Sequence, residues 1–215
     1  NEKYKDQLKE LESRKSLLNL VNDWLERTPF LDFKGFDFDT SYKAAVQNML
    51  RKEKAAIENT DILSPEYKAM RIRMLGDTGD YFESALNPDD HRKLMEEGKI
   101  TLSYKAMIAA LLINLYQDEP ILHQPFRLLT TLVDIDELLT TWRYRHAHMV
   151  LRMLGKKIGT GGSSGHEYLR KTAEKHSIFS DLYRISTMLI PKSDIPPLPD
   201  DLKASLGFHF STIKR

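Results

Sequence analysis

The segment PFRLLTTLVDIDELLTTWRYRHAHMVLRMLG, residues 125–155, decides the fold class. Its apolar side chains recur at alternating spacings of four and three residues, the repeat of one face of an α-helix. This face, which we name the 128–153 seam, consists of Leu128, Leu132, Ile135, Leu139, Trp142, His146, Met149 and Met153. Because glycine commonly follows the last turn of a helix, we predict one long helix from near Pro125 to Gly155 with the seam buried.

Helical periodicity extends over most of the remaining chain, and no strand alternation of useful length interrupts it. Helices are predicted over 4–27, from Asp39 or Thr40 to about Asn59, from 64 to the mid-eighties, and over 87–99, 101–117 and 166–190. The helix within 101–117 is the most apolar, and its all-round apolarity predicts a central, buried position. Gly76 and Gly79 are candidate points of interruption, and the proline-rich tail after 190 is expected to wrap the surface. These patterns predict an all-α fold, a bundle of long helices in which residues 1–215 form a single all-α domain portion.

Composition excludes several classes of function. Lys and Arg number 32 against 31 Asp and Glu, so the net charge of +1 offers no general attraction for nucleic acid or an anionic membrane. No apolar run approaches the roughly 20 residues that a bilayer span needs. The chain has no cysteine, which excludes disulfides and Cys-based zinc sites. We therefore expect a cytoplasmic protein without nucleic-acid or membrane partners.

His146 is the unusual member of the seam, because every neighbour at helical spacing is apolar. One interpretation is a core histidine that bonds a backbone carbonyl. The other is an axial haem ligand, since neutral imidazole binds iron well and an apolar face suits a porphyrin. Zinc is disfavoured, because no second histidine or carboxylate shares this face. A third possibility is a non-catalytic all-α interaction module whose seam pairs with a partner helix.

The glycine-rich stretch GTGGSSG, residues 159–165, follows the long helix. It is not a P-loop, because His166 and Glu167 stand where Lys and Ser or Thr are required. It is not a dinucleotide fingerprint either, because it follows a helix and Ser164 occupies the third glycine position. What remains is either an ordinary connector or a mobile loop whose N–H groups and hydroxyls bind an anionic head group.

Taken together, WRYRHAHMVLRMLGKKIGTGGSSGHEYLR strongly resembles the C-terminal region of the tryptophan 2,3-dioxygenases. LVNDWLERTP (20–29), LSYKAMIAALLINLYQDEP (102–120) and STMLIP (186–191) resemble further segments of that family, in the same order. The resemblance covers nearly the whole chain. It implies a haem b oxidoreductase that inserts O2 across the indole C2–C3 bond of L-tryptophan to give N-formyl-L-kynurenine, the first step of tryptophan catabolism through kynurenine.

The same resemblance implies roles for individual residues. His146 matches the family's axial ligand of the haem iron, and Trp142, one turn earlier, should help to wall the haem. The substrate-binding residues implied in the loop are Thr160, Gly159, Gly161 and Ser163. No further catalytic residue is implied in this chain. Trp24 and Arg27 match another family segment, and they are either a second site for an aromatic ligand or a packing cluster at a helix end.

One part of the family pattern is not found in this sequence. The N-terminal half that supplies the distal pocket, with its histidine, phenylalanine and arginine, has no counterpart here, and the chain begins with Asn1. We weigh a nicked protein, an isolated fragment and a divergent paralogue, and favour the first. The expected partners are then the N-terminal portion of the same protein as a separate chain, L-tryptophan and O2, and further copies in a homotetramer, a dimer of dimers.

Overall fold

The computed structural model describes residues 4–155, 164–175 and 177–207, and these form helices with one minimal hairpin. In chain order the elements are α1 (Lys5–Ser13), α2 (Leu17–Glu26), β1 (Asp32–Phe33), β2 (Phe36–Asp37), α3 (Phe38–Asn59), α4 (Pro65–Ala85), α5 (Pro88–Glu96), α6 (Tyr104–Leu115), α7 (Pro120–Leu154), α8 (Gly165–Lys175), α9 (Ser180–Ser186), the 3-10 turn η2 (Lys192–Asp194) and α10 (Asp200–Leu206). The all-α prediction is therefore confirmed.

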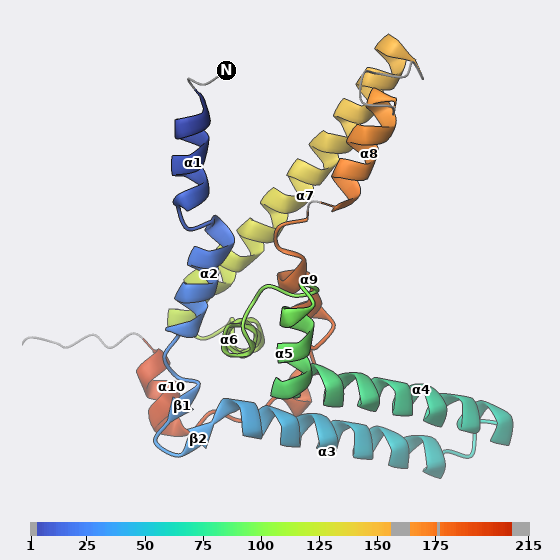
Figure 1. Cartoon of the computed structure of the whole chain (residues 1–215). Helices are drawn as coiled ribbons and strands as arrows, with labels where there is room; N and C mark the ends of the chain where they lie inside the picture. The colour runs from blue at the N-terminus through green and yellow to red at the C-terminus, as the bar shows by residue number, and fades with distance from the viewer. Residues whose placement is uncertain (1–3, 156–163, 176, 208–215) are drawn as a thin grey trace, which may run out of the picture.

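The helices extend from a common centre in three arms (Figure 1). The antiparallel pair α3 and α4 forms one arm, α1 and α2 form another, and the long α7 with α8 along its C-terminal part forms the third. Helix α6 lies at the centre, where it contacts α2, α5, α7 and α9. No helix in the described ranges is both long and apolar enough to cross a membrane.

The central position of α6 follows from its sequence. Ser103 caps the helix by accepting a hydrogen bond from the N–H of Ala106 at 3.2 Å, and every residue from Ile108 to Ile113 is buried. A helix that is apolar on all sides must be covered on all sides. The prediction of a buried central helix within 101–117 is thus confirmed, and this helix contacts α2 and α7, which belong to two of the three arms.

The predicted helix over 4–27 is wrong, because the chain breaks between α1 and α2. Ser16 adopts an extended conformation and accepts a hydrogen bond from the N–H of Asn19 at 3.1 Å. A serine in this position starts a new helix instead of continuing the old one. The prediction of a start near Asp39 is closer: Asp37 caps α3, which begins at Phe38.

Two predictions that were based on proline and glycine positions are wrong. Helix α7 begins at Pro120 and contains Pro125 in its second turn, so the predicted start near Pro125 is wrong. Because proline has no N–H, the one helical hydrogen bond that residue 125 would have donated is lost there. Helix α4 runs through Gly76 and Gly79 without interruption. Gly155 does end α7, with φ of 63° and its N–H bonded to Leu151 O at 2.9 Å.

The predicted helix over 166–190 is also wrong, because α8 ends at Lys175 and α9 begins at Ser180. The carboxylate of Asp136 on α7 accepts the N–H groups of Ile178 and Phe179, at 2.9 and 3.0 Å. A side chain distant in sequence therefore satisfies N–H groups that a continuous helix would have used itself.

The hairpin of β1 and β2 is too short for alternation to reveal. Phe33 pairs with Phe36 across Lys34 and Gly35, which both have positive φ, of 46° and 87°. Positive φ at both turn residues is typical of a type I′ hairpin, and glycine at the second position favours it. The hairpin turns the chain into α3.

The tail does not simply wrap the surface, because part of it enters the core. Leu202 and Leu206 of α10 are buried, and the hydroxyl of buried Tyr116 donates to the carbonyl of Pro196 at 2.7 Å. The hydroxyl of Tyr42 likewise donates to the carbonyl of Met188. These bonds connect α3 and the end of α6 to the C-terminal segment, and so stabilise the centre from which α7 extends.

Candidate functional site

His146 lies on the C-terminal half of α7 and is half-buried. Its ring contacts the ring of Trp142, one turn earlier, with centroids 5.5 Å apart and planes tilted by 38°. Among the described residues, neither imidazole nitrogen has a hydrogen-bond partner. The backbone carbonyl that a core histidine would bond is thus not found among the described residues, and the haem-ligand role of His146 stays a prediction.

The 128–153 seam is exposed over most of its length, which contradicts the predicted burial. Leu132 alone among its apolar members is buried, whereas Trp142 is 60% and Met153 is 74% exposed. Helix α6 packs near the base of α7 and α8 packs along its outer part, and neither covers this face. The result is an open apolar stripe with an imidazole in its middle, of the size and chemistry that large flat ligands or partner proteins cover.

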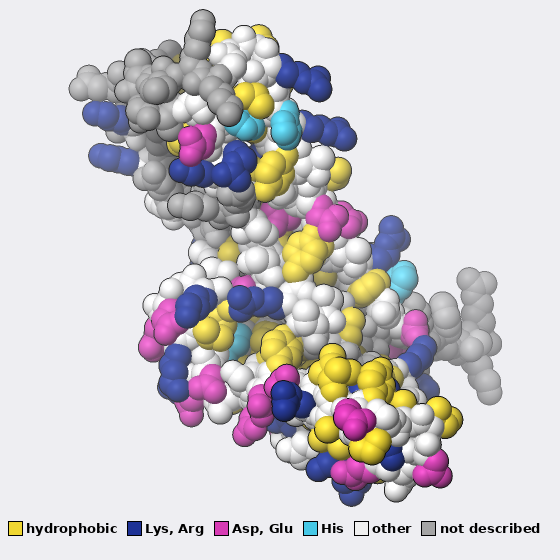
Figure 2. All heavy atoms as spheres, turned by 90° about the vertical axis from the view of Figure 1, so that its right-hand side faces the viewer, with side chains coloured by type: hydrophobic (Ala, Val, Ile, Leu, Met, Phe, Trp, Pro, Cys, Tyr) yellow, Lys and Arg dark blue, Asp and Glu magenta, His cyan; other side chains and the backbone are white. Residues whose placement is uncertain are grey.

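Helix α8 is held against α7 next to His146. His166 donates from Nδ1 to the carbonyl of Ala147 at 3.0 Å, and its ring lies 5.8 Å from that of His148. At Gly165 an added Cβ would lie 3.4 Å from Val150 Cγ1, so the backbones of the two helices approach closely. Figure 2 shows histidine side chains together with lysine and arginine side chains near this end of the molecule.

The predicted substrate-binding residues Gly159, Thr160, Gly161 and Ser163 lie outside the described residues. The two ends of their loop are described, however. Gly155 leaves α7 and Ser164 returns the chain to it, with the carbonyl of Ser164 accepting the N–H of Tyr168 at 3.1 Å. The loop therefore begins and ends beside the outer part of α7, the same part that carries His146.

The far end of α8 is tied to α7 by Asp136, which is 2% exposed. Its Oδ2 accepts the hydroxyl of Ser177 at 2.7 Å, together with the N–H groups of Ile178 and Phe179. Burial disfavours the charged carboxyl, but these three donors and the nearby Arg143 outweigh it, so that the pKa of Asp136 lies below its usual range. Sequence reasoning missed this residue, because its partners lie more than 40 positions away in the chain.

Trp24 and Arg27 do not form a closed site. Trp24 is half-buried and packs against the core, while Arg27 is exposed and donates from Nε to the carbonyl of Asp23 at 3.0 Å. An open hollow beside Arg27 is lined by Leu20, Asp23 and Glu26. Trp24 thus contributes to packing at the end of α2, and a second site for an aromatic ligand at Trp24 and Arg27 stays a prediction.

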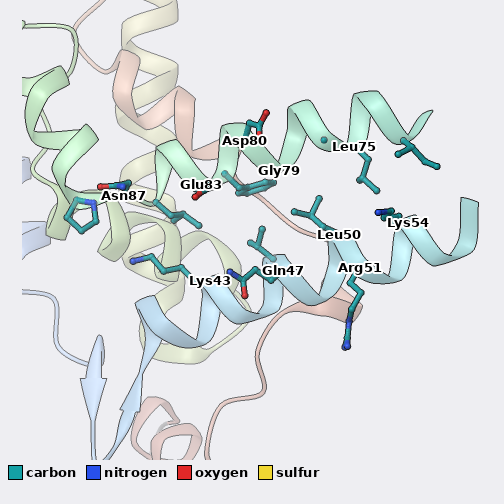
Figure 3. Close-up of a pocket in the computed structure, with 16 residues that line it drawn as sticks. Lys43, Gln47, Leu50, Arg51, Lys54, Leu75, Gly79, Asp80, Glu83 and Asn87 are labelled. Carbon is teal, nitrogen blue, oxygen red and sulfur yellow. The ribbon is translucent and has the colours of Figure 1, made fainter. Parts of the chain in front are cut away.

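A second hollow runs between α3 and α4, near the base of their arm (Figure 3). Leu50 and Leu75 point into it from opposite helices, and Gly79 allows the approach, since a Cβ there would lie 3.5 Å from Leu50 Cδ1. Lys43 and Glu83 flank it. Without a buried unpaired polar group, this hollow carries no recognisable chemistry.

Further out, apolar side chains gather at the free end of the arm, including Ile62, Tyr67, Met70 and Met74 (Figure 2).

The comparisons with known proteins agree on one family. A family model described as tryptophan 2,3-dioxygenase matches residues 1–189. The chain is 49% identical to a tryptophan 2,3-dioxygenase of Bdellovibrio bacteriovorus over 195 residues, which cover 91% of this chain and 54% of the relative. It is 46% identical to one of Alteromonas mediterranea (94% and 56% covered) and 45% identical to one of Dictyostelium discoideum (99% and 54% covered). The chain thus spans about half the length of these relatives.

Proposed function

The chain belongs to the tryptophan 2,3-dioxygenase family, and from this premise we propose that it carries the haem-ligand part of an enzyme that oxidises L-tryptophan to N-formyl-L-kynurenine. Both atoms of O2 would be inserted across the indole C2–C3 bond. The observation that carries the proposal is the half-buried imidazole of His146, without a hydrogen-bond partner among the described residues, in the middle of an open apolar stripe.

The residues present fit a haem group. A porphyrin needs one nitrogen ligand and a broad apolar surface, and α7 offers His146 flanked by the exposed Trp142, Leu139 and Met149. In our proposal His146 would hold the haem iron and Trp142 would pack against the macrocycle. When bound, haem b would supply a ferrous centre for dioxygen activation, while the protein supplies orientation and excludes water.

Substrate binding is assigned to the glycine-rich loop. Thr160, with Gly159, Gly161 and Ser163 around it, would bind the amino-acid end of tryptophan through hydroxyl and N–H donors. Two observations support this part: both described ends of the loop lie beside the outer half of α7, and α8 is bonded to α7 at His166 and, through Asp136, at Ser177. These contacts would hold the loop within reach of a ligand bound at His146.

The proposal also includes the partners. The open 128–153 seam would be covered by the portion of the family chain that this sequence does not span, and the assembled enzyme would be a cytoplasmic homotetramer. The exposure of Trp142 and Met153 supports a covering partner, because apolar stripes of this kind favour association or aggregation. A non-catalytic interaction module has no observation of its own in its favour.

The test combines this chain with the portion of the Bdellovibrio relative that it does not span, co-expressed and supplied with haem. We expect a Soret band and tryptophan-dependent formation of N-formylkynurenine. His146→Ala should abolish stable haem binding, whereas His148→Ala, two residues later and exposed, should retain it. Normal haem content and spectrum in the His146→Ala protein would refute the ligand assignment.

Thr160→Ala tests the substrate-binding loop separately. Loss of one hydrogen bond to a charged head group costs about 1.5–3 kcal/mol, which corresponds to a roughly 10- to 150-fold weaker tryptophan affinity at unchanged haem content. An unchanged affinity would remove Thr160 from the proposed site.

A further inference from the structure

A separate cavity of about 460 Å³ lies between α4, α5, α9 and the start of α6. Its walls are largely apolar, with Leu94, Ile100, Met107 and Met188 among the residues that line it. None of its lining residues comes from α7, so it is distinct from the face that carries His146. A volume in this range, with apolar walls and few polar groups, is typical of sites for small molecules.

Asp181 lines this cavity, and only one of its two carboxylate oxygens accepts hydrogen bonds from the described residues. The side chain is 7% exposed, and its Oδ2 accepts the N–H of Thr101 at 2.6 Å, the hydroxyl of Thr101 at 2.9 Å and the N–H of Leu102 at 2.9 Å. Its Oδ1 is buried and lacks a hydrogen-bond partner within the described part of the chain. Because buried acceptors in proteins are almost always paired, Oδ1 is expected to bond a donor that the described residues do not supply.

His91 provides a second acceptor in the same cavity. Its neighbours in the sequence are polar, a pattern typical of the surface, but the side chain is 6% exposed and its ring packs edge-on against Tyr104, with centroids 5.5 Å apart. Its Nε2 lies 2.9 Å from the carbonyl of Leu102, which can only accept, so Nε2 carries the proton. In the neutral ring Nδ1 is then an acceptor, and it has no partner among the described residues.

We propose that this cavity binds a small primary amine with an apolar body, whose ammonium group donates to Asp181 Oδ1 and to His91 Nδ1. An ammonium group has three donors and no acceptor, so its chemistry suits a cavity whose lining offers unpaired acceptors, and a carboxylate offsets the cost of burying its charge. An alcohol has one donor and leaves one acceptor unpaired. Arg184 also lines the cavity and carries the same charge as the ligand, but it is exposed, where solvent screens it.

The test titrates the purified protein with 2-phenylethylamine near neutral pH, by calorimetry or ligand-observed NMR, with 2-phenylethanol as the uncharged comparator. For a ligand of this size we expect a Kd of about 1 mM or tighter for the amine, and binding at least about tenfold weaker for the alcohol. Equal affinity for the two compounds, or no binding of the amine at about 10 mM, would overturn the proposal.

Variants then locate the site. Asp181→Asn keeps an acceptor for Thr101 and Leu102 but removes the charge, and should weaken amine binding at least about tenfold. Ala85→Phe fills the cavity and should abolish binding, while Ala55→Phe, on the exposed face of α3, should not change it. Should Asp181→Asn fail to fold, Ala85→Phe and the alcohol comparator still decide the question.

Two further outcomes complete the test. Amine binding that survives Ala85→Phe in a folded protein would overturn the proposal, because the ligand would then bind elsewhere. The proposal does not rest on the haem assignment: His146→Ala should leave amine binding intact, so that failure of either idea is recognised separately.

Discussion

Asp136→Ala tests how the arm formed by α7 and α8 is held together. The variant removes one buried carboxylate and with it three hydrogen bonds, of 2.7, 2.9 and 3.0 Å, from Ser177, Ile178 and Phe179. We expect the free energy of unfolding to fall and the segment between α8 and α9 to lose its attachment to α7.

The magnitude follows from what happens to each donor. Ser177 and Ile178 are exposed and can bond water instead, which recovers most of their contribution. Phe179 is buried, so its N–H loses its partner with little access to water, a penalty of about 1–3 kcal/mol. The two exposed donors add a smaller loss, and the variant is spared the cost of burying one charge. We therefore expect the free energy of unfolding to fall by about 2–4 kcal/mol.

The assay is urea unfolding followed by far-UV circular dichroism, with amide hydrogen exchange to locate the loosened segment. Asp134→Ala is the matched control, because Asp134 is exposed on the same helix and the change in helix propensity is the same. Faster exchange should concentrate at Ile178 and Phe179. A destabilisation within about 1 kcal/mol of the control, with unchanged exchange at these amides, would show that Asp136 does not hold the arm.

Three further changes test the fold and its response to acid. Asp136→Asn should lower the free energy of unfolding by about 1–2 kcal/mol at neutral pH. Because the native pKa of this carboxyl is lowered, the difference in unfolding free energy between parent and variant should narrow as the pH falls below about 4. A difference that stays constant with pH in urea titrations would contradict this. Tyr42→Phe should cost about 1–2 kcal/mol by leaving the buried carbonyl of Met188 unpaired, whereas Tyr67→Phe on the surface should match the parent in the same titration. Gly155→Ala should lower the free energy of unfolding by about 1–3 kcal/mol. The cause is the backbone conformation alone, with φ of 63° and ψ of −148°, since no atom lies within 4 Å of the added Cβ. An unchanged melting temperature would refute this reasoning.

Local chemistry explains the features that were predicted correctly. Ser64 before Pro65 starts α4 by accepting the N–H of Tyr67, and Gly155 ends α7, and both signals act within a few residues. The apolar composition of 101–117 predicted the central helix for a similar reason, because a helix apolar on every side has no face for solvent. The quoted motifs likewise identified the family, which the comparisons confirm.

Features that depend on distant partners were predicted wrongly or missed. An apolar seam indicates that a face is suited to burial but does not supply the segment that covers it, and Trp142 is 60% exposed in this chain. The polar neighbours of His91 in the chain are typical of a surface residue, although Leu102 and Tyr104 enclose it in space.

The sequence alone determined the start of α4 at Ser64, the end of α7 at Gly155, which helix is central, and which family the chain belongs to. The tertiary structure decided the two buried carboxylates, Asp136 and Asp181, the break between α8 and α9, and the open face around His146. The physical reason is the distance along the sequence over which each kind of interaction acts. Capping and periodicity act over a few residues, whereas burial and the pairing of a carboxylate depend on groups some 40 to 80 positions away, which only the folded chain brings into contact.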